Sequence, residues 1–275
     1  MTGQAPEIQA PEIGVMTMRT GLAVGGAVLV LLGGAVLSWG GPSDTRTGSP
    51  SGVSAVELRS GPGAVKINYE AGAEPRVREE RDGWWGGWGR NSETNYRVDD
   101  GRLVLETDCG WGCDVEYEVT LPRRVPVTGG LGSGSLEVTG MSSTDVRVGS
   151  GALELRGIDG EVRAETGSGG IELTDIGGPV NVSTGSGQIE GEGIDSADVT
   201  TRTSSGGISL ELSDPRSVRA DTGSGGIELT VPANSYSVRA DTGSGSTDIE
   251  VARDADAERS LRLSTGSGSI EVESS

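Results

Sequence analysis

The sequence predicts an all-β protein, a parallel β-solenoid with about 18–20 residues per coil, preceded by one N-terminal transmembrane helix. Three observations predict this architecture. An eight-residue phrase repeats along the C-terminal half, apolar and polar residues alternate on both sides of each copy, and a 20-residue uncharged apolar run lies near the N-terminus. Gly accounts for 48 of the 275 residues and Phe is absent, which favours many turns around a thin aliphatic interior.

The repeated phrase is TGSGGIEL at residues 166–173, and it recurs unchanged at residues 222–229. Related copies begin at Leu131, Val148, Thr184, Thr203, Thr242 and Thr265. The second residues of the eight copies are separated by 17, 18, 18, 19, 19, 20 and 23 residues. A period of this length indicates a repeat architecture in which each unit buries its apolar row only by stacking on its neighbours.

Each repeat reads as two strands of about five residues joined at a Gly-Ser-Gly corner. Aligning the copies gives inward apolar columns, so successive repeats are expected to stack in parallel and in register. The column before the corner holds Val162, Val180, Val199, Val218, Val238 and Leu261. The columns after it hold Leu136, Leu153, Ile171, Ile189, Ile208, Ile227 and Ile270, then Leu155, Leu173, Leu210, Leu229 and Val272, with Gly191 as the one lapse.

An outward column of carboxylates lies between these apolar columns. It consists of Glu137, Glu154, Glu172, Glu190, Glu228 and Glu271, and Ser209 interrupts it. Neighbouring carboxylates about 4.8 Å apart repel each other by on the order of 1 kcal/mol in water. The column is interpreted as a solvated acidic face that keeps the sheet soluble, and the alternative is a surface that binds divalent cations. We predict no metal site from it.

Other outward columns place Arg and acidic residues on one face, which favours ion pairs between coils. One such column contains Arg163, Asn181, Thr200, Arg219, Arg239 and Arg262. Thr247 and Asp248 read as an insertion after the phrase, and residues 252–260 read as an acidic surface excursion.

Before the β region, residues 1–19 are predicted to be a cytoplasmic tail, residues 20–41 a transmembrane signal-anchor helix and residues 42–55 a flexible linker. Arg19 on the tail side puts the N-terminus in the cytoplasm and the rest of the chain outside. The alternative is secretion after cleavage of a signal peptide, and translation could start at Met1, Met16 or Met18. The expected location is therefore the cell membrane, with a single span.

Residues 56–128 are predicted to form an N-terminal β region, and residues 129–275 the repeat solenoid. An Asp-Gly turn at residues 100–101 predicts a hairpin. Trp84, Trp85 and Trp88 in a Gly-rich segment form either a lid over the solenoid or a surface that binds a partner. Cys109 and Cys113, the only cysteines, are predicted to form a disulfide, because two Cys without His complete neither a zinc site nor a C-x-x-C redox motif.

Composition excludes several function classes. A net charge of −19 makes nucleic acid an unfavourable partner. His is absent, so Ser-His and Cys-His catalysis is excluded. We predict no catalytic residue and no cofactor.

An exported anchor, a YEVTLP strand at residues 117–122 and repeated TGSG-x-I-E-[VL] coils together resemble the bacterial adhesin-like family DUF4097. The CGWGC stretch at residues 109–113 is similar to that of actinobacterial members. The resemblance covers residues 56–275 and implies a β-solenoid on the cell envelope, without assigning any site residue.

The expected function is a membrane-anchored, extracytoplasmic binding, adhesion or scaffold surface for an envelope protein or a glycan. Two alternatives remain open at this point. One is a polysaccharide-active β-helix enzyme that would use acids and an arginine such as Glu172 and Arg163. The other is an accessory protein of an envelope-stress signalling system.

Overall fold

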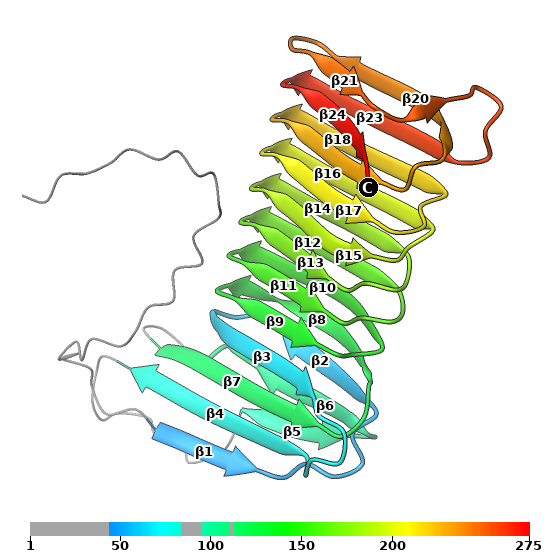
Figure 1. Cartoon of the computed structure of the whole chain (residues 1–275). Helices are drawn as coiled ribbons and strands as arrows, with labels where there is room; N and C mark the ends of the chain where they lie inside the picture. Colours follow the sequence, from blue (N-terminus) through cyan, green and yellow to red (C-terminus); the bar gives the residue numbers. More distant parts are fainter. Residues whose placement is uncertain (1–43, 84–94, 110–112) are drawn as a thin grey trace, which may run out of the picture. The chain divides into compact units, whose positions relative to one another are not determined.

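The computed structural model describes residues 44–83, 95–109 and 113–275 (Figure 1). These residues form strands and turns and no helix, so the described part of the chain contains no membrane-spanning helix. The strands make two sheets of twelve strands each. The all-β prediction is thus confirmed. The predicted tail at residues 1–19, the predicted transmembrane helix at residues 20–41 and Trp84, Trp85 and Trp88 lie outside the described residues.

The strands of the two sheets, here named sheet A and sheet B, alternate along most of the chain. Sheet A contains β1 (Asp44–Gly48), β3 (Gly63–Tyr69), β4 (Arg76–Gly83), β7 (Cys113–Leu121), β9 (Leu136–Thr139), β11 (Leu153–Arg156), β13 (Ile171–Thr174), β15 (Ile189–Ile194), β17 (Ile208–Leu212), β19 (Ile227–Val231), β21 (Thr247–Ile249) and β24 (Ile270–Ser274). Sheet B contains β2 (Ala55–Arg59), β5 (Tyr96–Asp99), β6 (Arg102–Glu106), β8 (Pro126–Ser133), β10 (Ser143–Ser150), β12 (Val162–Ser168), β14 (Val180–Ser186), β16 (Asp198–Ser205), β18 (Ser217–Ser224), β20 (Ser235–Thr242), β22 (Ala252–Arg253) and β23 (Ser260–Ser267).

Each coil contributes one strand to sheet B and the next to sheet A, and neighbouring coils pair in parallel. Thr166 pairs with Thr184 in sheet B, and Ile171 pairs with Ile189 in sheet A. Because equivalent residues lie side by side, their inward side chains form continuous ladders. The core between the sheets consists of these aliphatic ladders. The predicted stacking of the repeats is confirmed from β8 to β19.

The Thr of the repeated phrase is an inward residue with a role of its own. Thr184 is buried, and its hydroxyl donates to the carbonyl of Gly169 in the preceding coil at 2.9 Å. Thr222 does the same to Gly206, also at 2.9 Å. Gly169 itself has a φ of 141°, and a Cβ there would collide with the carbonyl oxygen of Gly151. The phrase therefore needs a Thr hydroxyl that bonds to the neighbouring coil. It also needs a glycine whose positive φ and missing Cβ allow the coils to lie this close together.

The solenoid begins earlier than residue 129. β2 and β3 form a coil of the same plan, because β2 pairs in parallel with β8 and β3 pairs in parallel with β9. β6 and β7 form another coil below it, with β6 on β2 and β7 on β3. The predicted boundary at residues 128–129 falls within β8, inside one continuous stack of coils, and the Gly-Pro-Gly turn at residues 61–63 is a coil corner.

Antiparallel strands finish this end of the molecule. β5 pairs with β6 through the predicted Asp-Gly hairpin, where Asp100 and Gly101 have φ of 46° and 77°. β4 pairs antiparallel with β7, and β1 pairs antiparallel with β4. The segment predicted as a linker, residues 42–55, thus contains β1. Its backbone satisfies the edge of β4, which would otherwise be open to other chains.

At the other end, the last two coils are stacked in the reverse of their chain order (Figure 1). Val218 on β18 pairs with Leu261 on β23, and Leu261 pairs with Val238 on β20. The expectation that these repeats stack in chain order is therefore wrong. Thr247 and Asp248 are also not an insertion, because Thr247 pairs with Ile270 and Asp248 with Glu271. An exposed Thr in place of the ladder Ile costs little on an end coil.

The lapse in the apolar ladders at Gly191 is compensated by a β-bulge. The register between β15 and β17 shifts between Gly191 and Ile194, and Ile194 pairs with Leu212. A Cβ on Gly191 would lie 2.7 Å from Cδ2 of Leu210 and 3.3 Å from Cγ1 of Ile194. These two side chains fill the space that a leucine fills in the other coils, so the core stays closed.

Candidate binding surfaces

The structure places the predicted acidic column on the outer face of sheet A. Glu137, Glu154, Glu172 and Glu190 are consecutive partners in register. Ser209 follows, and then Glu228 pairs with Glu271. Asp248 of the end coil extends the column by one carboxylate.

Cations pair with the carboxylates of the first half of this column. The Lys66 ammonium lies 2.8 Å from Oε1 of Glu137. The Arg156 guanidinium contacts Glu154 and also lies 2.8 Å from Oε1 of Glu172. Because each pair is half-exposed, it adds little to stability. Two cations face three carboxylates here, so their main effect is to reduce the negative charge of this half of the face.

The second half keeps its charge. Among the described residues, Glu190, Glu228 and Glu271 form no ion pair. A hydrogen bond with Glu273, the charge of Glu273 and smaller effects of Glu228 and Asp248 raise the pKa of Glu271. This half of sheet A is therefore a negative surface, suited to a cationic partner or to simple hydration.

A shallow hollow of about 360 Å³ lies on this acidic half. Its polar lining comes from Glu172, Thr174, Gln188, Glu190, Glu192, Ser209, Glu211, Glu228 and Thr230. Within the described part of the chain, no three acidic or Cys side chains lie close enough together to hold a metal ion. The carboxylates come from four neighbouring strands, with two on β15 and one each on β13, β17 and β19, so they form an extended negative surface and not a coordination sphere.

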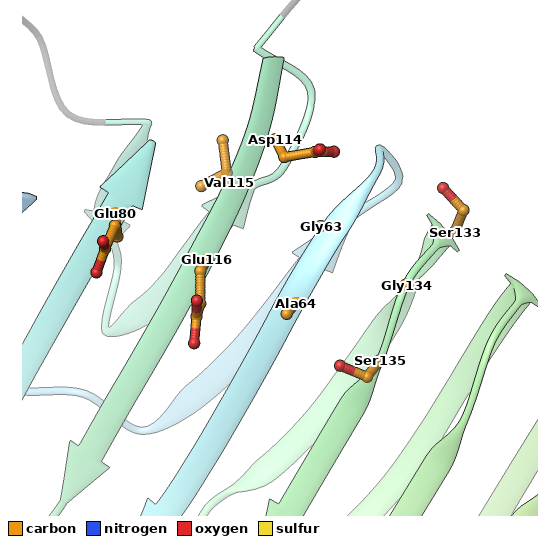
Figure 2. Close-up of a pocket in the computed structure, with 9 residues that line it drawn as sticks. All are labelled: Gly63, Ala64, Glu80, Asp114, Val115, Glu116, Ser133, Gly134 and Ser135. Carbon is orange, nitrogen blue, oxygen red and sulfur yellow. The ribbon is translucent and has the colours of Figure 1, made fainter. Parts of the chain in front are cut away.

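A second hollow, of about 300 Å³, lies near the other end of the same sheet (Figure 2). It exists because β3 begins with Gly63 and Ala64, which leave space beside the longer side chains of β7 and β4. Glu80, Asp114 and Glu116 contribute carboxylates, and Glu80 is paired with Arg78 at 3.1 Å. Ser133 and Ser135 add hydroxyl groups on the other side of the hollow, so its polar lining is made of carboxylates and hydroxyls.

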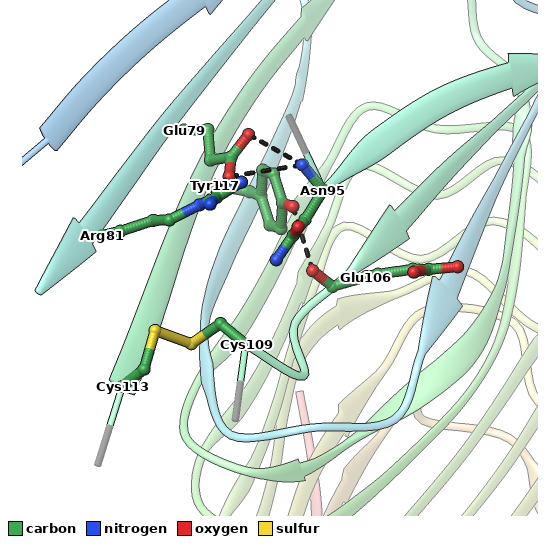
Figure 3. Close-up of a disulfide and its surroundings, with 7 residues drawn as sticks. All are labelled: Glu79, Arg81, Asn95, Glu106, Cys109, Cys113 and Tyr117. Carbon is green, nitrogen blue, oxygen red and sulfur yellow. Dashed lines mark hydrogen bonds and ion pairs between the residues drawn. A yellow bond between two sulfur atoms is a disulfide. The ribbon is translucent and has the colours of Figure 1, made fainter. Parts of the chain in front are cut away.

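The predicted disulfide joins Cys109 to Cys113, whose Cα atoms are 5.8 Å apart (Figure 3). It closes the corner between β6 and β7, where the later coils have Gly-Ser-Gly. Cys113 is also the backbone partner of Gly83 at the end of β4. The disulfide therefore stabilises the corner where the antiparallel strands meet the solenoid.

A buried ionic cluster lies beside this staple (Figure 3). Glu79 is 0% exposed, pairs with Arg81 and accepts the backbone N–H of Asn95 at 3.3 and 3.4 Å. Tyr117, the cross-strand partner of Glu79, donates its hydroxyl to the carbonyl of Glu106 at 3.0 Å. Burial, and then the charge of Glu79, raise the pKa of Tyr117. The sequence carried no signal for this cluster, because VREER also fits a strand at the surface.

The arrangement required by the enzyme alternative is not formed. Glu172 lies on β13 in sheet A, whereas Arg163 lies on β12 in sheet B, and both point outward. Arg163 pairs with Glu161, and Glu172 pairs with Arg156. The two named groups therefore face opposite sides of the solenoid and cannot act on one bond.

The profile of the family described as Toastrack DUF4097 matches residues 116–275. The chain belongs to this family. In this Toastrack protein the match starts within β7 and covers every later coil, while the coil of β2 and β3 lies outside it. The expected family is confirmed over that range.

Solved structures similar to this Toastrack protein include three candidate adhesins. The one from Bacteroides fragilis is 11% identical, with 84% of this chain and 97% of that chain covered and a TM-score of 0.43. The one from Parabacteroides distasonis is 13% identical, with 84% and 97% covered and a TM-score of 0.39. The one from Parabacteroides merdae is 14% identical, with 84% and 96% covered and a TM-score of 0.33. No curated protein matches the chain.

Proposed function

We propose that this Toastrack protein is a non-catalytic binding or scaffold surface of the cell envelope. In this proposal residues 20–41 anchor it in the membrane, and everything after them is extracytoplasmic. Its partner is an envelope protein or a glycan. The Trp residues 84, 85 and 88 stay a predicted contact for that partner.

The observation that carries the proposal is the in-register outer face. Equivalent polar residues of many coils lie side by side, as Glu154 and Glu172 do in sheet A and Ser168 and Ser186 do in sheet B. Such a surface repeats one chemistry at intervals of about 4.8 Å, which suits an extended or repeating partner. A catalytic site instead needs unlike groups that converge on one point.

Co-sedimentation with the isolated cell envelope of the source organism tests the binding role. The full chain in detergent is expected to bind saturably, without release of reducing ends or unsaturated sugars. Release of sugar in proportion to added protein would instead identify an enzyme.

Protease added to intact cells tests the topology. Extracytoplasmic β-strands are expected to be clipped at exposed turns, while a tag at the N-terminus stays protected. Protection of the whole chain would contradict the proposed location.

A further inference from the structure

Three arginines lie side by side on the outer face of sheet B, at the end of the solenoid formed by the C-terminal coils. Arg219 on β18 pairs with Arg262 on β23, and Arg262 pairs with Arg239 on β20. All three side chains are exposed. At about 4.8 Å per strand, their backbones span roughly 10 Å. The reversed order of the last two coils puts Arg262 in the middle, and we call this set the arginine row.

The arginine row is not balanced by carboxylates as other arginines of this face are. Arg147 pairs with Glu165 of the next coil at 3.3 Å, whereas Arg239 and Arg262 have no ion pair within the described residues. Arg219 alone has a partner, since its Nε lies 2.7 Å from Asp221. Neighbouring like charges repel by on the order of 1 kcal/mol each. In a chain of net charge −19, this local surplus of positive charge is an exception.

Hydroxyl groups adjoin the arginine row on one side. Ser217, Ser260 and Ser237 form the outward column two residues earlier on the same three strands. On the other side lie Asp221, Ser264 and Asp241. An anion is therefore attracted by the guanidinium groups, repelled by the two carboxylates, and directed towards the serine hydroxyls, which can donate hydrogen bonds to it.

We infer that the arginine row and its serine column bind a linear anionic glycan, with a carboxylate or phosphate at regular intervals, that lies across the strands along the solenoid. Guanidinium groups match the oxygens of both anions, and a repeating row matches a repeating charge. Nucleic acid fits less well, because the outward residues of β18, β20 and β23 include no aromatic side chain on which a base could stack. The inference rests on the proposed binding function and names its partner chemistry.

The test compares two charge-matched double variants of the full chain in detergent. Arg239→Gln/Arg262→Gln replaces the two arginines that have no ion pair within the described residues, so the fold loses no ion pair. Arg147→Gln/Arg163→Gln removes the same charge from lower coils of the same face. The probes are polygalacturonate, a linear poly(hexose phosphate), neutral dextran and duplex DNA.

The wild-type protein is expected to bind one or both anionic polymers, with a Kd that rises with NaCl concentration. The first double variant is expected to bind about tenfold more weakly, and the second within about twofold of wild type. The two anionic polymers distinguish a uronate from a phosphate source, and either supports the inference.

Equal weakening by both variants, no weakening by the first, or equal binding of dextran or DNA would overturn the inference. Binding to the isolated envelope that persists in the first variant, with no binding to either anionic polymer, would overturn the inference and leave the proposed function standing. A wild-type protein that does not bind the isolated envelope would overturn both the inference and the proposed function.

Discussion

Leu261 on β23 lies between Val218 on β18 and Val238 on β20, so the last coil of the chain is not the last coil of the solenoid. The coil of β23 and β24, the last in the chain, buries Leu261, Leu263, Ile270 and Val272. The coil of β20 and β21, the last in the solenoid, leaves Val238, Ala240 and Ile249 only partly buried. The more apolar coil thus takes the inner position, and the coil with Thr247 in the ladder takes the end.

This order predicts unequal costs for one substitution at two places. Val272 is 0% exposed and Val238 is partly buried. Val272→Ala should lower the free energy of unfolding by about 2 kcal/mol, and Val238→Ala by less than about 1 kcal/mol, because only the first leaves a closed cavity. Urea denaturation measures both. Stacking in chain order would reverse the ranking.

The buried carboxylate of Glu79 should be far more important for stability than its neighbour Glu80. Glu79→Ala removes the buried acceptor that Arg81 and the N–H of Asn95 share, and should cost about 3–5 kcal/mol. Glu80→Ala removes only a half-exposed pair with Arg78 and should cost less than about 1 kcal/mol. Denaturant unfolding at pH 7 compares them, and similar costs would refute the burial of Glu79.

Reduction of the disulfide should weaken the antiparallel end of the molecule. Cys109 and Cys113 are four residues apart, and closing so short a loop stabilises the fold by about 2 kcal/mol. Thermal unfolding with and without reductant measures this difference. The Cys109→Ser/Cys113→Ser variant is the control and should not respond to reductant. An unchanged midpoint in the wild-type protein would show that the staple contributes nothing.

Neutralising Glu271 should stabilise the protein at pH 7. Its pKa in the folded state is raised above the ordinary 4.5, so the folded state is favoured when this group is protonated. That contribution is present below pH 4.5 and is lost as pH rises through the folded pKa. Glu271→Gln should therefore have a higher Tm than wild type at pH 7, and the gap should close as pH falls towards 4.5.

The matched control for this prediction is Glu137→Gln. Glu137 belongs to the same column but is paired with Lys66 at 2.8 Å. Its neutralisation removes an attraction and should not raise the Tm. A rise in both variants would show that net charge, and not the unbalanced half of the face, sets the effect.

The repeated phrase was enough to predict the ladders, because equivalent residues must meet when coils stack in register. Residues 60–65, SGPGAV, resemble the corner and following strand of the phrase, so the sequence did indicate the coil of β2 and β3, although it lies outside the regular spacing of the later copies. Thr247 in an Ile column likewise signalled an end coil, but only the strand order shows which coil replaces it inside.

Features that depend on long-range pairing could not be predicted. Glu79 alternates correctly for an ordinary strand, and its burial follows from β4 lying beside β7 and from Asn95 reaching it. The arginine row was visible as a column, yet its sequence order placed Arg239 beside Arg219. The reversed coils bring Arg262 between them.

We propose that this protein acts through its outer faces and not through a catalytic site. The most direct test is envelope co-sedimentation of the quadruple variant Arg239→Gln/Arg262→Gln/Glu228→Gln/Glu271→Gln, which changes both faces and leaves the net charge unaltered. We expect the quadruple variant to bind more weakly than the wild-type protein, and neither protein to release sugar. Full binding by the quadruple variant, or sugar release by the wild-type protein, would contradict it.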